Sequence, residues 1–592
     1  MDGPRTAQSA FQNVRYGKVS EEVTVEGCDS SNETQTTSPE SQESMDLDEI
    51  LDELGHFGKF QLISFLLISF PIIFSATFAL SYIFTAGDLN YRCHIPECEG
   101  MDTTFDTEWL RNAVPFQQDS TDVPSRCLRF AFLKEKALGF SENKTLQGYN
   151  DSVCTEKYFD RNTTVKCDKW VYEEGITILR EWDITCEENR WALTIVGTIN
   201  NVGQFIGMPI AGMVSDRIGR KRALVIAVFL AAIMGITRSL AWSYTSFLVF
   251  EFLDPLCGSG LYTAGFVLGM ELVGPKGRVF AGTIVSVFYT IGEVILGCVS
   301  LWLQNWRLIL RVIYIPALLC VAHYWLATES VRWLLAKGRT KEASEIVLKA
   351  ARTNGVTLPQ QLLNKLRASA DTKNELAKQQ GNNGARKETM IQIFQSRILL
   401  KRLIISAFCW FSTTFVFFGL SLNSVSVGGN KYTNFILGAL IEVPAYITFY
   451  LCLDRIGRKY TLCISFILSG ISCIAFAFMP TDMDNLQLAL FLMGKFGITT
   501  AFAVVFVFTA ELFPTELRHS MLGTCSMLGR IGSVIAPQTP LLGQYLKSLP
   551  LLLFGTMSVL SGLLSFTFPE TLHLKLPDTI EEAENIGKKR EN

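Results

Sequence analysis

The sequence predicts an all-α membrane protein with twelve spanning helices in two six-helix halves. Three observations lead to this prediction: twelve long apolar stretches, a motif repeated at equivalent places in the two halves, and basic residues concentrated in every second loop. Of the 592 residues, 48% are hydrophobic and only 18% are charged, whereas soluble domains have about 25% charged residues.

Each apolar stretch is long enough for a spanning helix, which needs about 20 predominantly apolar residues. Some stretches contain Gly or Pro, which spanning helices tolerate. The expected spans are approximately 60–84, 191–213, 223–242, 246–270, 279–302, 308–328, 402–424, 433–453, 460–480, 486–510, 519–545 and 548–569.

Basic residues indicate which way the chain faces, because Lys and Arg concentrate in the cytosolic loops of membrane proteins. The loops after the even-numbered spans two, four, eight and ten hold most of them, namely Arg217, Arg220, Lys221, Arg222, Lys276, Arg278, Arg455, Arg458, Lys459 and Arg518. The opposite loops hold little beyond Arg307, Lys431 and Lys547. We therefore expect both termini to lie in the cytosol and the chain to be a multi-pass protein of the plasma membrane.

The loop at about 85–190, between spans one and two, is then extracellular. It contains six cysteines, which in an oxidising compartment predict three disulfides of undetermined pairing: Cys93, Cys98, Cys127, Cys154, Cys167 and Cys186. It also contains three N-glycosylation sequons, at Asn143, Asn150 and Asn162. Charge bias, cysteines and sequons agree on the side of the membrane.

The remaining segments define the domain organisation. Residues 1–59 are polar and acidic and read as a disordered cytosolic tail. We expect an N-terminal half at 60–328, a cytosolic helical linker at 329–400, a C-terminal half at 401–569 and a cytosolic tail at 570–592. The net charge of −3 gives no indication of nucleic-acid binding.

An internal repeat supports two equivalent halves. Gly212–Arg222 reads GMVSDRIGRKR after span two, and Asp454–Lys459 reads DRIGRK after span eight. A Glu and an Arg seven residues apart follow both span four and span ten. Two matches at equivalent places indicate a duplication.

The charged members of these repeats are candidates for charge latches that stabilise one position of the two halves: Asp216, Arg217, Arg220, Glu271, Arg278, Asp454, Arg455, Arg458, Glu511 and Arg518. The alternative is that they only anchor the topology, although the acidic members are not needed for that. The pattern resembles the major facilitator superfamily, in which two six-helix halves rock around a site near the membrane midplane.

Further segments resemble the organic cation, carnitine and organic anion transporter family within that superfamily. Besides the long cysteine-bearing loop, these segments are Glu181–Cys186 (EWDITC), Thr328–Leu334 (TESVRWL), Asn423–Asn430, Pro569–Thr571 and Leu576–Glu584. Thr328 and Val331 replace two prolines of the family's PESPRWL motif. The resemblance covers about residues 46–586.

Two ionisable residues within spans are the main candidates for substrate binding, because such residues are costly in a membrane and usually functional. Glu442 lies in LIEVPAY of span eight, where the family has a cavity-facing glutamate. Arg530 lies in SMLGRIGSVIAP of span eleven, where cation-selective members have aspartate and anion and carnitine members a basic residue. A zwitterion would satisfy both charges. Alternatively, the two pair with each other as a structural bridge.

Aromatic residues complete the expected site. By alignment with the family, Tyr262, Tyr289, Trp410 and Phe417 are candidate cavity walls, and an aromatic ring attracts an ammonium group. The alternative for each is packing or contact with lipid. Glu251, Glu293 and Lys495 also fall at or within spans, where interior-facing structural or gating roles are expected.

We therefore expect a secondary-active or facilitative transporter of a small organic ion, favouring a zwitterionic or anionic amine-containing metabolite. An organic cation uniporter is the alternative, and a non-transporting receptor or channel fits the duplication poorly. The sequence has no P-loop, HExxH or GxSxG with placed partners, so neither an enzyme nor ATP-driven transport is indicated. The expected partners are the substrate and the bilayer; no cofactor or nucleic acid is expected, and a coupling ion is left open.

Overall fold

The computed structural model describes residues 58–99, 103–116, 124–133, 154–274, 277–357, 395–480, 483–514, 517–546, 548–574, 576–577 and 579–587, His519 without its side chain. The predicted tail lies outside the described residues except for its last two positions. So do residues 358–394 of the predicted linker, the sequons at Asn143 and Asn150, and the loop residues Lys276 and Lys547.

Helices dominate the described chain, and seven of those described are long and apolar enough to cross a membrane. These are Lys59–Thr85, Arg278–Leu303, Trp306–Leu326, Arg397–Ser426, Lys431–Ile456, Arg458–Ala477 and Asp484–Leu512. In element terms they comprise α2 (Lys59–Leu80) with α3 (Tyr82–Thr85), α11 (Arg278–Leu303), α12 (Trp306–Ala317) with η5 (Leu318–Ala322) and α13 (His323–Leu326), α18 (Arg397–Asn423) with η6 (Ser424–Ser426), α19 (Lys431–Leu440) with α20 (Glu442–Ile456), α21 (Arg458–Ala477) and α22 (Asp484–Leu512).

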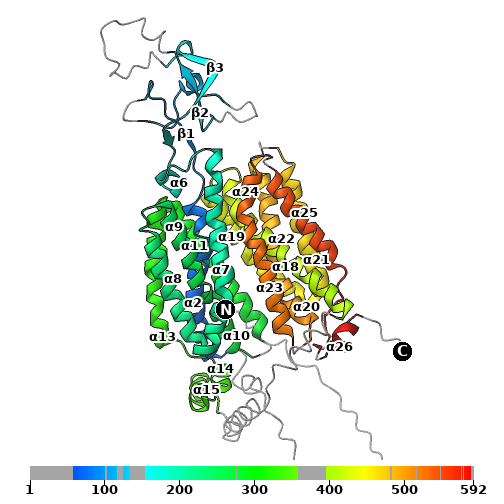
Figure 1. The fold of residues 1–592 in the computed structure, drawn as a ribbon. Coiled ribbons are helices and arrows are strands. Elements are labelled where there is room, and N and C mark those ends of the chain that lie inside the picture. Colours follow the sequence, from blue (N-terminus) through cyan, green and yellow to red (C-terminus); the bar gives the residue numbers. More distant parts are fainter. Residues whose placement is uncertain are drawn as a thin grey trace, which may run out of the picture. The chain divides into compact units, whose positions relative to one another are not determined.

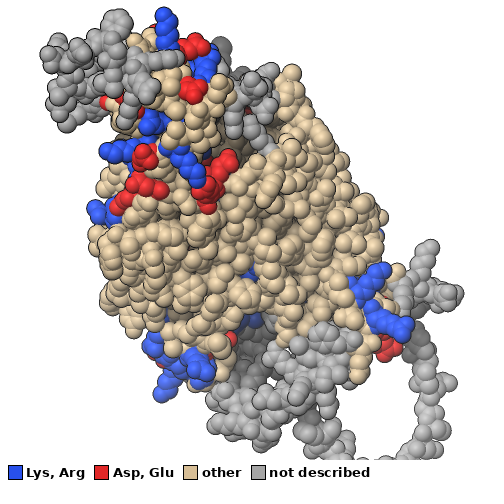
Figure 2. Space-filling view, turned by 45° about the horizontal axis from the view of Figure 1, so that its top comes forward, with Lys and Arg blue, Asp and Glu red and all other residues tan. Residues whose placement is uncertain are grey.

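Helices also occupy the other five predicted spans, but they are shorter or more polar. They are α7 (Arg190–Ile218), α8 (Arg220–Arg238), α9 (Tyr244–Gly258) with α10 (Gly260–Glu271), α23 (Arg518–Ile535) with η7 (Ala536–Gln538) and α24 (Thr539–Leu542), and α25 (Leu549–Ser565). Figure 2 shows a broad uncharged surface over the helices, with the charged side chains gathered beyond its two ends.

The helices form two bundles that follow the sequence. Figure 1 shows α2 and α7–α13 together in blue to green and α18–α25 together in yellow to red. The bundles meet where α7 contacts α23 and where α11 contacts α19 and α20. Two helices break inside a predicted span, at Ser259 between α9 and α10 and at Ile441 between α19 and α20. Pro444 lies in the first turn of α20, where its missing N–H has no intrahelical partner to lose.

A small disulfide-bonded unit lies between α3 and α7. Strand β1 (Tyr91–Cys93) pairs antiparallel with β4 (Trp170–Tyr172), and β2 (Leu128–Phe132) pairs with β3 (Phe159–Lys166). The six cysteines form three disulfides, the number that the sequence predicts: Cys93–Cys167, Cys98–Cys154 and Cys127–Cys186. The short helices α4 (Leu110–Ala113) and α6 (Ile178–Glu181) and the turns η2 (Glu156–Tyr158) and η3 (Glu187–Asn189) complete it. Asn162, the one described sequon, is exposed on β3.

Short amphipathic helices cover the opposite end of the molecule. Helices α14 (Val331–Ala336) and α15 (Thr340–Asn354) bury apolar residues against Phe60 of α2. The Asn354 side chain accepts a hydrogen bond from the Phe60 N–H at 2.8 Å and so satisfies a backbone donor in the first turn of α2. At the C-terminus, Arg402 of α18 donates to the carbonyls of Ala583 and Ile586 at the end of α26 (Ile580–Asn585).

Candidate functional site

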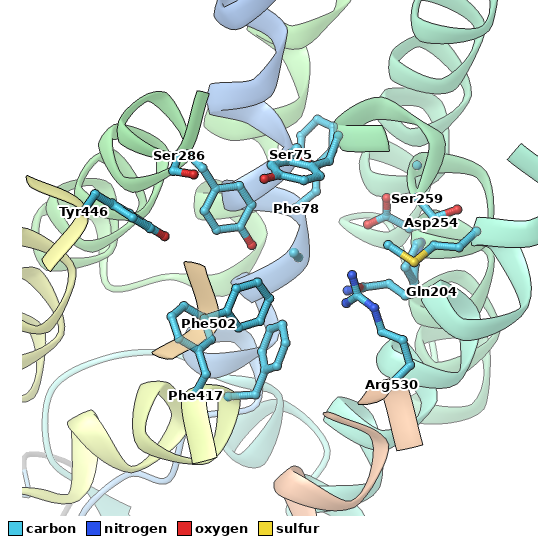
Figure 3. A pocket seen from close by; sticks show the side chains of 17 residues that line it. Ser75, Phe78, Gln204, Asp254, Ser259, Ser286, Phe417, Tyr446, Phe502 and Arg530 are labelled. Carbon is cyan, nitrogen blue, oxygen red and sulfur yellow. The ribbon is translucent and has the colours of Figure 1, made fainter. Parts of the chain in front are cut away.

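A cavity of about 120 Å³ lies between the two bundles and is lined by helices of both. Its size approaches the roughly 150 Å³ of an engineered cavity that holds benzene. Figure 3 shows two different sides: Arg530 extends toward Gln204, Asp254 and Ser259, whereas Phe417, Phe502 and Tyr446 lie opposite. The cavity therefore offers a charged side and an aromatic side to one small molecule.

Four of the six residues predicted to bind substrate line this cavity: Tyr262, Tyr289, Phe417 and Arg530. They come from α10, α11, α18 and α23, so both bundles contribute. The rings of Tyr262 and Tyr289 meet edge to face with centroids 5.6 Å apart, a favourable arrangement for aromatic pairs. Glu442 and Trp410 are not among the lining residues.

The Arg530 side chain has no carboxylate within ion-pair distance (4.0 Å) among the described residues. Its helix is held close to α18, because a Cβ on Gly529 would lie 3.2 Å from the Trp410 carbonyl oxygen. The Thr414 hydroxyl also donates a hydrogen bond to the Gly529 carbonyl. This packing fixes the position from which the guanidinium reaches the cavity. A guanidinium is always charged and matches a carboxylate with two parallel hydrogen bonds.

Asp254 of α9 brings a negative charge to the same side of the cavity. It is 1% exposed, and its Oδ2 lies 3.3 Å from Arg238 Nη1 and accepts a hydrogen bond from the Tyr314 hydroxyl. Its Oδ1 is buried and has no hydrogen-bond partner among the described residues. A buried acceptor that lines a cavity and has no partner is suited to receive a donor from a ligand.

Asp254 belongs to a fully buried polar network centred on Arg238 of α8. Arg238 Nη1 lies 2.7 Å from Glu251 Oε2, and Nη2 donates to the hydroxyls of Ser81 and Tyr314 at 2.9 and 3.1 Å. Asn200 donates to Glu251 Oε1 at 2.8 Å. The network satisfies most of the charges that it buries and holds α7, α8, α9 and α12 together.

Glu442 forms an ion pair with Lys495 and not with Arg530, the partner that the sequence suggested. It is completely buried, and its Oε1 lies 2.9 Å from Lys495 Nζ of α22. Its Oε2 accepts a hydrogen bond from the Thr290 hydroxyl at 3.3 Å. The structure therefore brings Glu442 together with Lys495, and the postulated bridge between Glu442 and Arg530 is not formed.

Trp410 also lies behind the cavity wall. It is 2% exposed, its indole N–H donates to the Thr509 hydroxyl at 2.9 Å, and its ring lies 5.2 Å from that of Phe506. These contacts satisfy its only polar atom and pack α18 against α22.

The predicted charge latches form matching ion pairs, each within one bundle. Arg220 Nη1 lies 2.7 Å from Asp216 Oδ1, and its Nε lies 3.7 Å from Glu271 Oε2. The equivalent Arg458 lies 3.1 Å from Asp454 and 3.2 Å from Glu511. Arg217 and Arg455 are exposed, and Arg278 and Arg518 begin α11 and α23.

Two glutamates near the halves' ends extend the symmetry. Glu329 Oε1 accepts hydrogen bonds from the backbone N–H groups of Arg220 and Lys221, at the start of α8. Glu570 accepts the equivalent bonds from Arg458 and Lys459, at the start of α21. A carboxylate at a helix N-terminus satisfies free N–H groups and interacts favourably with the helix dipole.

Comparison with known proteins places these features in a family. The family described as "Sugar (and other) transporter" matches residues 145–582. The Drosophila melanogaster "Organic cation transporter protein" is 31% identical over 554 residues, 92% of this chain and 96% of that protein. The mouse "Organic cation/carnitine transporter 2" is 31% identical over 549 residues, 91% and 94% of the two chains. This chain belongs to the organic cation/carnitine transporter family of the major facilitator superfamily.

Solved structures show that this family member has the major facilitator fold. The E. coli xylose transporter XylE in a partially occluded inward-open conformation aligns with a TM-score of 0.56 at 15% identity, over 86% of this chain and 99% of that one. XylE bound to 6-bromo-6-deoxy-D-glucose aligns with a TM-score of 0.52 at 18% identity, over 69% and 93%. At this identity the likeness concerns the fold alone.

Asp254 is the charged cavity residue that sequence reasoning missed. The signal was present, because an aspartate within the predicted span 246–270 is an intramembrane ionisable residue. Tyr446 and Phe502, which also line the cavity, gave no such signal. An aromatic residue in a spanning helix is usually a packing residue, and only the folded structure places these two at the wall.

Proposed function

We propose that this protein transports a zwitterionic or anionic, amine-containing small organic ion by alternating access around the cavity between its two halves. The observation on which the proposal rests is the pair Arg530 and Asp254, two cavity residues of opposite charge. Within the described chain, Arg530 has no carboxylate within ion-pair distance and Asp254 Oδ1 has no hydrogen-bond partner. A carboxylate of the substrate would bind Arg530, and its amine would donate to Asp254 Oδ1.

The two charged groups lie on one side of the cavity (Figure 3), which favours a substrate whose amine and carboxylate are only a few bonds apart. A beta-amino acid has this form. A carnitine-like betaine has the same spacing, but its quaternary ammonium has no N–H and would be held at Asp254 by charge attraction alone. The apolar part of the substrate would then contact the opposite side. There the rings of Phe417 and Tyr446 contribute apolar surface (Figure 3), and cation–π attraction would add about 0.5–2 kcal/mol for an ammonium group.

We further propose that the chain crosses the plasma membrane twelve times, with both termini in the cytosol and the disulfide-bonded unit outside. Basic residues at the starts of α8 and α21 support this orientation. Asn143, Asn150 and Asn162 would then be available for glycosylation. The ion pairs of Arg220 and Arg458 would stabilise each half at its cytosolic end and rearrange as that end opens.

Transport of a simple organic cation is the second candidate. The aromatic side of the cavity and the buried Asp254 would both attract a cation, and the related proteins named above are called organic cation transporters. Against it stands Arg530, since an unpaired guanidinium in a cavity of this size repels a substrate that has only positive charge.

Uptake into cells that express the full chain tests the proposal. We expect radiolabelled carnitine or beta-alanine to accumulate above empty-vector cells, and tetraethylammonium and benzoate to accumulate less. Uptake of tetraethylammonium alone would favour the second candidate. Uptake of none of the four, with the protein at the cell surface, would contradict the proposed substrate class.

A further inference from the structure

A groove of about 480 Å³ lies where the start of α18 meets the end of α25, and it shares no lining residue with the cavity. Pockets that bind small organic ligands have volumes of about 300–1,000 Å³. The residues that line the groove are Arg397, Leu400, Lys401, Ile404, Ile405 and Leu564. The groove is therefore large enough to hold part of an organic molecule.

One face of α18 supplies most of the groove. Its residues have the spacing i, i+3, i+4 and i+7, which places side chains next to one another on a helix: Arg397, Leu400, Lys401 and Ile404. Ile404 is 60% exposed, and both basic side chains are exposed as well. The opposite face of the helix is buried in the protein and includes Leu399, Arg402, Leu403 and Ser406.

The groove is basic at one end and apolar at the other. Arg397 and Lys401 contribute two positive charges in the first two turns of α18. Leu564 lies deeper, because the hydroxyl of its neighbour Ser565 is 3.5 Å from Cys409 Sγ. Helix α25 has no charged residue. A groove of this kind fits an amphipathic ligand with an anionic head, because both basic side chains donate charge-assisted hydrogen bonds to phosphate.

The acidic side chains near the start of α18 do not neutralise these two charges. Helix α26 has three glutamates, but Arg402, on the buried face of α18, donates to the carbonyls of Ala583 and Ile586 at its end. Glu584 accepts a hydrogen bond from the Ser396 hydroxyl. Within the described ranges, no carboxylate lies within ion-pair distance of Arg397 or Lys401. Both are thus available to an anion.

The length of α18 places its first turns at the membrane surface. The apolar span Arg397–Ser426 has 30 residues, which at 1.5 Å per residue is about 45 Å, whereas the hydrocarbon core is about 30 Å thick. The start of α18 lies with α26 at the end of the molecule opposite the disulfide-bonded strands (Figure 1). In the orientation proposed above, this end faces the cytosol, and the cytosolic leaflet contains anionic lipids.

We propose that the groove binds an anionic phospholipid of the cytosolic leaflet, with its phosphate at Arg397 and Lys401 and an acyl chain along Ile404 and Leu564. The choice of leaflet uses the proposed orientation, whereas the proposed substrate plays no part. A zwitterionic phospholipid would bring its own ammonium group and leave a net positive charge at the groove. A water-soluble phosphate would leave the apolar end uncovered. The bound lipid would join α18, which carries Phe417 of the cavity, to α25.

Native mass spectrometry of the purified full-length chain, stripped of lipid in detergent, provides the test. The chain is titrated with dioleoylphosphatidylserine or dioleoylphosphatidylcholine, and the fraction with one bound lipid gives the affinity. Two basic residues beside an anionic lipid surface strengthen binding by roughly 30-fold together, so we expect a preference for phosphatidylserine of this size.

The variants locate this preference on the two basic residues. R397Q with K401Q is expected to abolish it, and the charge-conserving R397K with K401R is expected to keep it. K341Q with K349Q is the matched control, because it removes two exposed positive charges of α15, and it should also keep the preference. Monodisperse elution in size-exclusion chromatography shows that each variant is folded.

Photo-crosslinking then locates the lipid in the wild type, whether or not a variant folds. A phosphatidylserine with a diazirine near the ester end of one acyl chain should label peptides that contain Ile404 or Leu564. Equal binding of the two lipids, a preference retained by R397Q with K401Q, or labelling only of other peptides would overturn the inference. Displacement by glycerophosphoserine, the same head group without acyl chains, would indicate a site for a soluble anion and would overturn the assignment to a lipid.

Discussion

Replacing Arg238 tests the energetics of the buried network around the cavity. In R238Q, Glu251 loses a partner at 2.7 Å and Asp254 loses one at 3.3 Å, and both carboxylates are at most 1% exposed. Removing one partner of a buried ion pair costs about 3–5 kcal/mol, because the remaining charge is left uncompensated. The loss of hydrogen bonds to Ser81 and Tyr314 adds to this cost. We expect R238Q to fall at the upper end of that range.

The opposite replacement, E251Q, is expected to be much milder. It leaves Arg238 with Asp254 as a balanced pair, and glutamine can still accept the hydrogen bond from Asn200. Thermal unfolding of the detergent-solubilised protein, followed by size-exclusion fluorescence, compares the two variants. R217Q is the matched control, because Arg217 is exposed, and we expect it to melt like the wild type. If R238Q were as stable as the wild type, or less perturbed than E251Q, the assignment of Arg238 as the counter-ion of two carboxylates would be refuted.

Three further predictions follow from the packing. Gly197 of α7 lies where the halves meet, and a Cβ there would lie 2.7 Å from Tyr82 and 2.8 Å from Pro537; overpacking of this kind costs about 1–3 kcal/mol. G197V should therefore separate the two halves where Tyr82 and Pro537 meet α7. It should increase labelling of an S75C cavity cysteine by an impermeant thiol reagent added from outside. G212V, whose added Cβ would meet no atom within 4 Å, should not increase it. E570A removes the acceptor for two N–H groups of α21 and should lower stability by about 0.5–2 kcal/mol in thermal unfolding, an effect that E342A should lack. C127S with C186S removes the disulfide that joins β2 to the start of α7 and should cost about 2–5 kcal/mol and reduce surface expression measured by biotinylation, whereas C298S, at an exposed free cysteine, should leave expression unchanged.

The general architecture could be predicted because it depends on patterns that are local in sequence. The length of the apolar stretches, the basic loops and the repeated DRIGRK motif can each be interpreted without knowing which residues they contact in the folded protein. The pairing of the six cysteines could not be predicted, because it depends on the register of β1 with β4 and of β2 with β3. The sequence also did not show which of the twelve predicted spans would form helices that are too short or too polar to count as membrane-spanning.

The site was predictable only in part for the same reason. Arg530 is recognisable by its charge within a span. The role of Glu442, by contrast, depends on Lys495, which is 53 residues away on another helix and forms an ion pair with it. The prediction of a pair of opposite charges in the cavity stays a prediction, with Asp254 in the place first given to Glu442. Arg220 and Arg458 each pair with the aspartate four residues earlier, as that spacing indicates. Each arginine also contacts a distant glutamate, Glu271 or Glu511, which the spacing in the sequence did not indicate.

Reversal of the charge at position 530 is the most direct test of the central claim that Arg530 selects a substrate with a carboxylate. The measurement is the ratio of beta-alanine or carnitine uptake to tetraethylammonium uptake in cells that express R530D, normalised to surface protein. A charge-assisted hydrogen bond contributes about 1.5–3 kcal/mol, so we expect this ratio to fall by at least tenfold, with tetraethylammonium uptake unchanged or increased. An unchanged ratio at normal surface expression would contradict the account and would make Arg530 a structural residue.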